Sequence, residues 1–180
     1  ADAILVQTQE QEAILRQRDW SYVGIIRNPV DVRRFGQWEN AYDQRQGCLW
    51  IGRYDRHHKR PHSLVRLAQL CPNIPFTAII NPGDRAIEAE IRANRPTNLK
   101  LIPYVPASKM PTYFSEHRLF LSTGSPEHEG FPNVFLEAAA AGTPIVSQYD
   151  FDSFLSRSGC GVVSGEDFPG AAELVQQLHG

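Results

Sequence analysis

The sequence of 180 residues lacks several features that would place it in a specialised class of protein. No apolar run approaches the roughly 18 residues that a membrane-spanning helix needs. Basic residues number 18 and acidic residues 20, so the chain lacks the basic excess of a general nucleic-acid binder. Its hydrophobic fraction of 42% is too high for a disordered chain. We therefore expect a globular protein with no nucleic acid among its partners.

Cysteine is scarce, with three residues whose spacings match no zinc-binding pattern. Cys48 and Cys160 lie in or beside apolar runs, and Cys71 precedes a proline. Three buried free thiols in a reducing compartment explain this usage better than a disulfide framework. The residues 1–6 also lack the basic start and the cleavage site of a signal peptide. We expect a cytoplasmic protein without a metal site, or a longer protein held peripherally at the inner face of the membrane.

Short apolar runs rich in branched residues alternate with segments in which apolar residues recur every three or four positions. The alternation predicts an α/β fold with a doubly wound, Rossmann-like parallel sheet. The expected strands are 4–6, 23–26, 48–51, 76–80, 99–102, 119–121, 144–146 and 161–163. The expected helices after residue 47 are 62–70, 84–94, 108–116, 133–141 and 171–178.

The alternation is interrupted at residues 31–46, which are polar and have no strand periodicity. We expect a linker there, with a helical turn near its middle. Residues 1–30 hold a strand, a helix and a second strand, which cannot enclose a core alone. They are expected to be the end of another domain, an interdomain segment, or an extension packed on the main domain. Residues 47–180 supply about six strands, enough for an independent domain.

The segment Glu129-Gly130-Phe131-Pro132-Asn133 begins a predicted helix at the carboxyl end of a strand. Proline suits the first helical position, and Gly142 suits the end of the helix. Free amides and the positive end of the helix dipole form an anion site at the usual ligand position of open α/β sheets.

Glu137 lies about five residues beyond Pro132, so roughly 7–8 Å further along the helix axis. Its carboxylate can accept hydrogen bonds from a vicinal diol such as ribose while a phosphate occupies the amides. Glu129, ahead of the helix, can face the group attached to the far phosphate. Alternatively, Glu129 is an acid favoured by the helix dipole and Glu137 is a solvated helix residue.

A basic loop follows the strand at 48–51, with Arg53 and Lys59 as counter-charges for a diphosphate. The alternative is a solvated or nonspecific polyanion-binding run. We interpret the adjacent His57 and His58 as surface histidines. In the loop before Glu129, Ser125 or Thr123 could donate to a phosphate. The sequence holds no Walker A motif and no nucleophile elbow, and Gly159-Cys160-Gly161 is too incomplete to be a dinucleotide fingerprint.

Taken together and in their order along the chain, these motifs resemble the C-terminal domain of retaining GT-B glycosyltransferases of the group one, or family four, class. The resemblance covers roughly residues 47–178, and the first thirty residues also fit. It implies a nucleoside-diphosphate sugar as donor substrate. Arg53 and Lys59 would offset charge on the diphosphate, and Glu129 would hydrogen-bond the donor sugar, so these three residues form the expected catalytic set. The expected substrate-binding residues are Glu137 for the ribose, together with Gly130, Phe131, Asn133, Ser125, Tyr104 and Gly83.

The resemblance also implies transfer of a hexosyl group to an acceptor hydroxyl with retention, without a cofactor or metal. The expected partners are the missing N-terminal GT-B domain and an acceptor saccharide or lipid-linked glycan, so the fragment alone would be inactive. The alternative is a nucleotide-binding or regulatory module, or a relative of nucleotide-sugar epimerases, on the same fold without transfer activity.

Three departures from the family pattern stand out. Five residues separate Arg53 from Lys59, where the family usually has four, so Arg56 could share their role. Gly83 is the expected equivalent of a glycine turn after the second strand. Pro103 replaces a glycine common after the third strand, near Tyr104, where the resemblance places the base.

Overall fold

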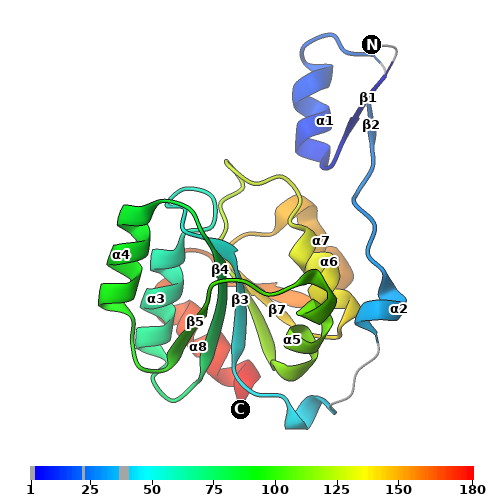
Figure 1. Cartoon of the computed structure of the whole chain (residues 1–180). Coiled ribbons are helices and arrows are strands. Elements are labelled where there is room, and N and C mark those ends of the chain that lie inside the picture. Colours follow the sequence, from blue (N-terminus) through cyan, green and yellow to red (C-terminus); the bar gives the residue numbers. More distant parts are fainter. Residues whose placement is uncertain (1–2, 22, 37–40) are drawn as a thin grey trace.

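A computed structural model describes residues 3–21, 23–36 and 41–180 of the chain (Figure 1). A six-stranded parallel sheet forms its centre, in the order β5-β4-β3-β6-β7-β8. A separate two-stranded parallel sheet pairs β1 with β2. The strands are β1 Ile4–Val6, β2 Val23–Ile25, β3 Cys48–Arg53, β4 Phe76–Asn81, β5 Leu99–Ile102, β6 Leu119–Ser122, β7 Ile145–Ser147 and β8 Gly161–Val163.

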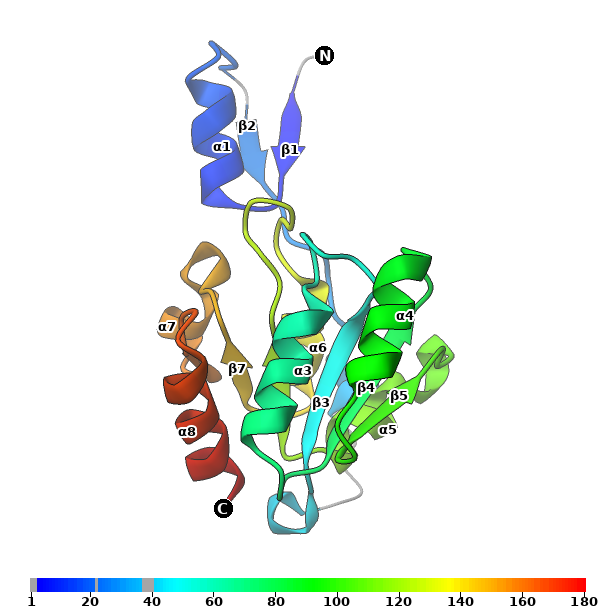
Figure 2. The same cartoon turned by 90° about the vertical axis from the view of Figure 1, so that its left-hand side faces the viewer.

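Helices cover both faces of the six-stranded sheet (Figures 1 and 2). The α-helices are α1 Gln9–Arg16, α2 Val32–Phe35, α3 Pro61–Leu70, α4 Arg85–Asn94, α5 Met110–Glu116, α6 Asn133–Ala140, α7 Phe154–Ser158 and α8 Phe168–His179. Short 3-10 turns lie at η1 Tyr42–Gln44, η2 Ala107–Lys109 and η3 Phe151–Ser153. The prediction of a doubly wound, Rossmann-like α/β fold is confirmed.

Two apolar cores, one on each face, hold the sheet between its helices. Under α3, α4 and α8, the core includes the fully buried Trp50, Leu64 and Val175. Under α5, α6 and α7 it is rich in aromatic rings, with the centroid of Phe135 5.6 Å from that of Phe151. Strands buried on both faces explain the nearly continuous hydrophobic runs of the sequence.

Local chemistry sets where the helices begin and end. Pro61 is the first residue of α3, and the Asp84 carboxylate caps α4 by accepting from the amide of Ala86 at 2.7 Å. Gly142, in the left-handed conformation at φ +59°, ends α6 as predicted. Pro132 was expected as the first residue of α6, but it is the N-cap, with extended ψ.

The N-terminal unit, residues 3–21 and 23–26, projects from the main domain in both views (Figures 1 and 2). Its two short strands and α1 leave several apolar side chains exposed. These are Leu5, Ile14, Trp20, Ile25 and Ile26. The N-terminal unit therefore leaves much of its apolar surface in water.

The segment predicted as a linker contains α2 and the turn η1 within its described residues. Asp31 begins α2 by accepting from the amides of Arg33 and Arg34, and the buried Phe35 anchors the helix in the core. The expected helical turn near the middle of the linker falls on residues 37–40, which lie outside the described residues.

All three cysteines are free thiols, with Cys48 and Cys71 buried and Cys160 half-buried. Within the described ranges, no helix is long and apolar enough to cross a membrane.

Candidate active site

The loops that carry the predicted site residues leave the sheet at its switch point. β3 pairs with β4 on one side and with β6 on the other, and the chain reaches β6 only after completing β4 and β5. The connections that follow β3 and β6 therefore depart in opposite directions from neighbouring strand ends. Such a divide is the general ligand position in open α/β sheets.

Asp55 organises the loop after β3. Its carboxylate accepts hydrogen bonds from the backbone amides of His57 at 2.9 Å and of His58 at 2.6 Å. The amide of His58 is the main cause that holds the pKa of Asp55 below its ordinary value, and the nearby guanidinium of Arg53, at 3.5 Å, acts in the same direction. Arg53 itself is the last residue of β3 and is exposed.

Lys59 and Glu129 form an ion pair between the two loops. The Lys59 side chain is 18% exposed and that of Glu129 is 9% exposed, so the pair is largely removed from water. Two residues proposed from separate motifs thus meet at one point.

Backbone and side-chain contacts lock the two loops together near this pair. The amide of Ser125 donates to the carbonyl of His58 at 3.1 Å, and the rings of His57 and His128 stack with centroids 5.5 Å apart. The Thr123 hydroxyl donates to the carbonyl of Lys59 at 2.7 Å.

The structure corrects the expectation that Thr123 could donate to a phosphate. Its side chain is buried, and its hydroxyl accepts from the Trp50 indole at 2.9 Å while it donates to the Lys59 carbonyl. Thr123 therefore supports the loop that carries Lys59.

His58 is the residue that the sequence argument missed. Its ring lies between Arg53 and Glu129, with Nδ1 3.3 Å from an Arg53 nitrogen and Nε2 3.7 Å from a Glu129 oxygen. The interpretation as a surface histidine is confirmed for His57, which is exposed, and is wrong for His58, which is half-buried. Burial is the main cause that lowers the pKa of His58 below its ordinary value.

The N-terminus of α6 lies three residues beyond Glu129, with Pro132 as its N-cap. Within the described residues, no side chain caps its amides. Phe131 is buried in the aromatic core, and this fixes the approach of the chain to the helix. The Asn133 side chain accepts from that of Asn28 at 2.9 Å, so in this structure it is engaged with the segment that leaves the N-terminal unit.

Glu137 is half-buried on α6. Burial raises the pKa of its carboxyl above the ordinary value, and the positive charge of Arg34 on α2 opposes this shift. A hydrogen-bond donor such as a sugar hydroxyl would relieve the desolvation of this carboxylate. The linker segment thus supplies a basic residue to the surroundings of Glu137.

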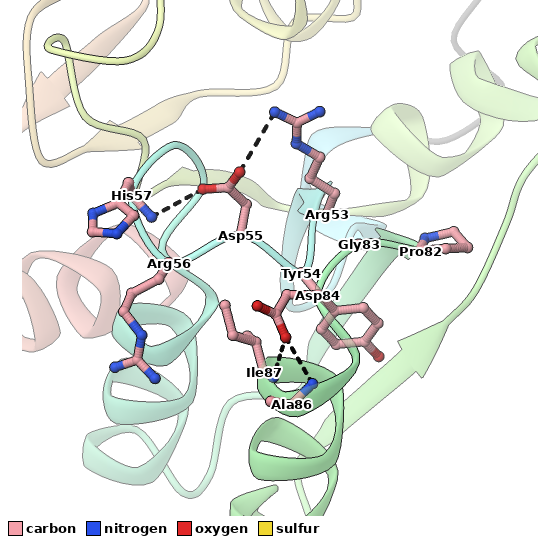
Figure 3. A pocket seen from close by; sticks show the side chains of 10 residues that line it. All are labelled: Arg53, Tyr54, Asp55, Arg56, His57, Pro82, Gly83, Asp84, Ala86 and Ile87. Carbon is pink, nitrogen blue, oxygen red and sulfur yellow. Dashed lines mark hydrogen bonds and ion pairs between the residues drawn. The ribbon is translucent and has the colours of Figure 1, made fainter.

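Gly83 and Arg53 both line a cavity of about 520 Å³ (Figure 3). A Cβ at Gly83 would clash with the backbone carbonyl of Tyr54, so only glycine fits the close approach of these two loops. Lys59 and Glu129 do not line this cavity. Tyr104 follows β5, two strands away from β3, and 67% of its surface is exposed.

A second cavity, of about 420 Å³, separates the loop before α6 from α1 of the N-terminal unit. Glu129 and Gly130 line it from the main domain, and Glu10 and Gln11 line it from α1. Glu129 therefore borders both the basic loop and the space between the two units. In the part of the chain that the structure describes, no group of three or more His, Cys, Asp or Glu side chains could hold a metal ion.

Several solved structures share this arrangement of strands and helices. TarM from S. aureus, in a mutant form solved with UDP, has a TM-score of 0.79 and 19% identity over 98% of this chain and 36% of TarM. Sucrose-phosphate synthase from Thermosynechococcus elongatus has a TM-score of 0.76 and 18% identity, over 99% of this chain and 49% of the synthase. HepE from Anabaena, solved with UDP and glucose, has a TM-score of 0.73 and 16% identity, over 99% of this chain and 57% of HepE.

The chain thus spans between about a third and three-fifths of the length of these proteins. Its six-stranded sheet with flanking helices matches the C-terminal domains of the GT-B fold. No curated protein matches the chain. The sequence model of the family described as "Glycosyl transferases group 1" matches residues 45–178, and the chain belongs to this family.

Proposed function

We propose that this chain is the donor-binding part of a retaining glycosyltransferase that transfers a hexosyl group from a nucleoside-diphosphate sugar to an acceptor hydroxyl. The contact between Lys59 and Glu129 at the switch point carries the proposal. It joins a basic group suited to a diphosphate with an acid suited to sugar hydroxyls, beside the N-terminus of α6.

In this proposal the diphosphate lies between Arg53, Lys59 and the first amides of α6. Lys59 leaves Glu129 and turns to the phosphate, because its flexible stem carries a mobile point charge. Glu137 accepts hydrogen bonds from the ribose hydroxyls, which satisfies its buried carboxylate. The exposed ring of Tyr104 lies near the base.

Gly83, Ser125, Gly130, Phe131 and Asn133 shape the rest of the proposed donor site. Ser125 holds its loop to the basic loop through its backbone, and Gly83 allows close contact with the exit of β3. The backbone amides at Gly130 and Phe131 face phosphate or sugar hydroxyls. Asn133 is available to the donor only after it exchanges its contact with Asn28.

Transfer requires that the bond between the anomeric carbon and the diphosphate oxygen breaks, with the electron pair leaving on the diphosphate. Arg53 and Lys59 stabilise this developing negative charge. The acceptor oxygen attacks the same face of the sugar, and its proton passes to the leaving diphosphate. This chemistry needs no metal or organic cofactor in the proposal.

The proposal includes a second, N-terminal GT-B domain as a partner. The exposed apolar side chains of the N-terminal unit, such as Leu5 and Ile26, offer a surface for it to cover. The acceptor, a saccharide or a lipid-linked glycan, would bind in the space between the domains. In the same proposal, the protein acts in the cytoplasm, or peripherally at the inner face of the membrane.

Titration calorimetry of the chain with UDP, GDP and ADP, and with their glucose or mannose conjugates, tests the proposal. We expect one nucleoside diphosphate to bind and the others to bind more weakly. Binding of none of them would refute the proposed function. If binding is found, transfer assays on the longer protein distinguish an active transferase from a nucleotide-binding module without transfer activity.

A further inference from the structure

His58 presents both of its ring nitrogens to proposed site residues from a fixed position. Its amide donates to Asp55 at 2.6 Å, and its carbonyl accepts from the amide of Ser125 at 3.1 Å. The backbone of His58 is therefore held by both loops. Its side chain is 23% exposed.

The surroundings of the ring determine which nitrogen carries the proton. An arginine can only donate, so Nδ1 of His58 must accept from Arg53 at 3.3 Å. The proton of the neutral ring then lies on Nε2, the atom that faces Glu129. His58 is therefore set to donate to a carboxylate.

Lys59 and His58 face the same oxygen, Oε1, of Glu129. Lys59 contacts this oxygen directly, whereas Nε2 of His58 lies 3.7 Å away, beyond hydrogen-bond distance. Glu129 thus has one mobile partner that carries full charge and one neutral partner that the backbone holds in place.

A diphosphate would attract Lys59 away from Glu129. Without another donor, the carboxylate of Glu129, 9% exposed, would lose its partner as the donor sugar arrives. We propose that His58 is a positioning residue that takes over the Oε1 oxygen of Glu129 when Lys59 turns to a bound diphosphate, and so keeps Glu129 directed at the donor sugar. This inference rests on the proposed function and assigns a role that the motif residues alone do not have.

Charge around the ring is consistent with a neutral donor. Arg53 and Lys59 lower the pKa of His58 and add to the larger effect of burial, while Glu129 and Asp55 raise it. The net direction is downward, so the ring is neutral near pH 7 and its Nδ1 remains free to accept from Arg53.

Three substitutions at His58 distinguish the roles of its two ring nitrogens. Glutamine keeps a donor near the position of Nε2, asparagine keeps a polar group near Nδ1 only, and phenylalanine keeps neither. We expect His58→Phe and His58→Asn to weaken binding of the nucleotide sugar about tenfold, the loss of one hydrogen bond to a charged group. His58→Gln should restore most of the affinity.

Binding of the nucleoside diphosphate without the sugar should follow the same order, because in the proposal Lys59 turns to the diphosphate whether or not the sugar is present. His58→Phe and His58→Asn should weaken this binding, and His58→Gln should bind the diphosphate within about twofold of the wild type. Rescue by glutamine but not by asparagine is the result that a purely structural role would not give. The same substitutions at His57, whose exposed ring stacks on His128, are the matched controls and should change neither ligand. Calorimetry with UDP and UDP-glucose, or with the GDP or ADP pair that the wild type prefers, gives both values.

Nitrogen-15 NMR of the unliganded chain tests the inference without any nucleotide. We expect the His58 ring as the tautomer protonated at Nε2, with a pKa that falls further in Glu129→Gln. A proton on Nδ1, or a His58→Phe variant that binds the nucleotide sugar like the wild type, would overturn the role of His58 while leaving the proposed function intact. A wild-type chain that binds no nucleoside diphosphate would instead refute the proposed function and, with it, this role of His58.

Discussion

Asp152 and Arg27 form an ion pair that joins the main domain to the segment leaving the N-terminal unit. The Asp152 side chain is 2% exposed, and it also accepts from the amide of Gln9, the first residue of α1, at 2.9 Å. A single carboxylate thus contacts both the start of α1 and the strand exit after β2. Its backbone is left-handed at φ +52°.

Asp152→Asn should loosen the N-terminal unit from the main domain. Asparagine tolerates the left-handed backbone, so the substitution removes the charge with little new strain. We expect faster cleavage within residues 3–30 in limited proteolysis, and a loss of about 1–3 kcal/mol in the free energy of unfolding. Asp43→Asn, at an exposed site, is the control. Equal cleavage rates in all three proteins would show that the ion pair does not hold the unit.

Arg53→Ala and Glu137→Ala should each weaken binding of a nucleoside diphosphate by roughly 1–3 kcal/mol, the cost of a lost charged hydrogen bond. Calorimetry measures the change, and Arg66→Ala, on the exposed side of α3, is the control. Unchanged affinity in Glu137→Ala would remove Glu137 from the proposed ribose contact.

Thr123→Val should destabilise the chain while preserving the shape of the side chain. The Trp50 indole would lose its acceptor and the Lys59 carbonyl its donor, both in a buried setting. We expect a loss of about 1–3 kcal/mol in the free energy of unfolding. Chemical denaturation of this variant beside Thr112→Val, at an exposed position, isolates the effect. A loss of the same size in both variants would contradict it.

Thermal stability should fall as the pH drops below about 6.5, the ordinary pKa of histidine. Burial lowers the pKa of His117 in the folded chain, and His179 is shifted in the same direction. As the pH falls, these histidines are therefore protonated in the unfolded state before they are protonated in the folded state. Their neutral forms contribute fully to the stability of the fold above the pKa of the unfolded state, and this contribution is lost as the pH falls through the pKa of the folded state. The amide of Gly47 donates to Nε2 of His179 at 2.8 Å, and protonation of His179 would remove this acceptor.

Melting temperatures between pH 7.5 and pH 5 measure this dependence. His117→Gln should show a shallower slope than the wild type, because Gln does not titrate. Comparing the two proteins removes the contribution of the carboxyl groups, including Glu137, whose raised pKa acts in the opposite direction. Parallel slopes would exclude His117 as a source of the acid sensitivity.

The strands were predictable because a parallel sheet that is buried on both faces requires short, nearly continuous apolar runs in the sequence. Eight expected strands match β1–β8 within one or two residues. The helix α7 was missed because it has five residues and begins after Asp152 and Ser153, both left-handed, which no periodicity indicates.

Site residues within motifs were easier to propose than residues whose role depends on how two loops meet. The spacing of Glu129 and Glu137 can be read along a single helix. The position of His58 depends on contacts between loops that are far apart in sequence, such as the one from Ser125. Arg34 was likewise assigned to a linker. Its position near Glu137 depends on the packing of α2 beside α6, which the sequence around Arg34 does not indicate.

The order of the strands also has a kinetic consequence. Pairing of β3 with β6 joins Cys48 to Leu119, with two strands and three α-helices lying between them in the sequence. Such a distant pairing closes a long loop and is intrinsically slow to form. The two loops at the switch point can meet only after it forms. A nucleotide bound there would therefore slow unfolding rather than speed refolding, and would lengthen the lifetime of the native chain.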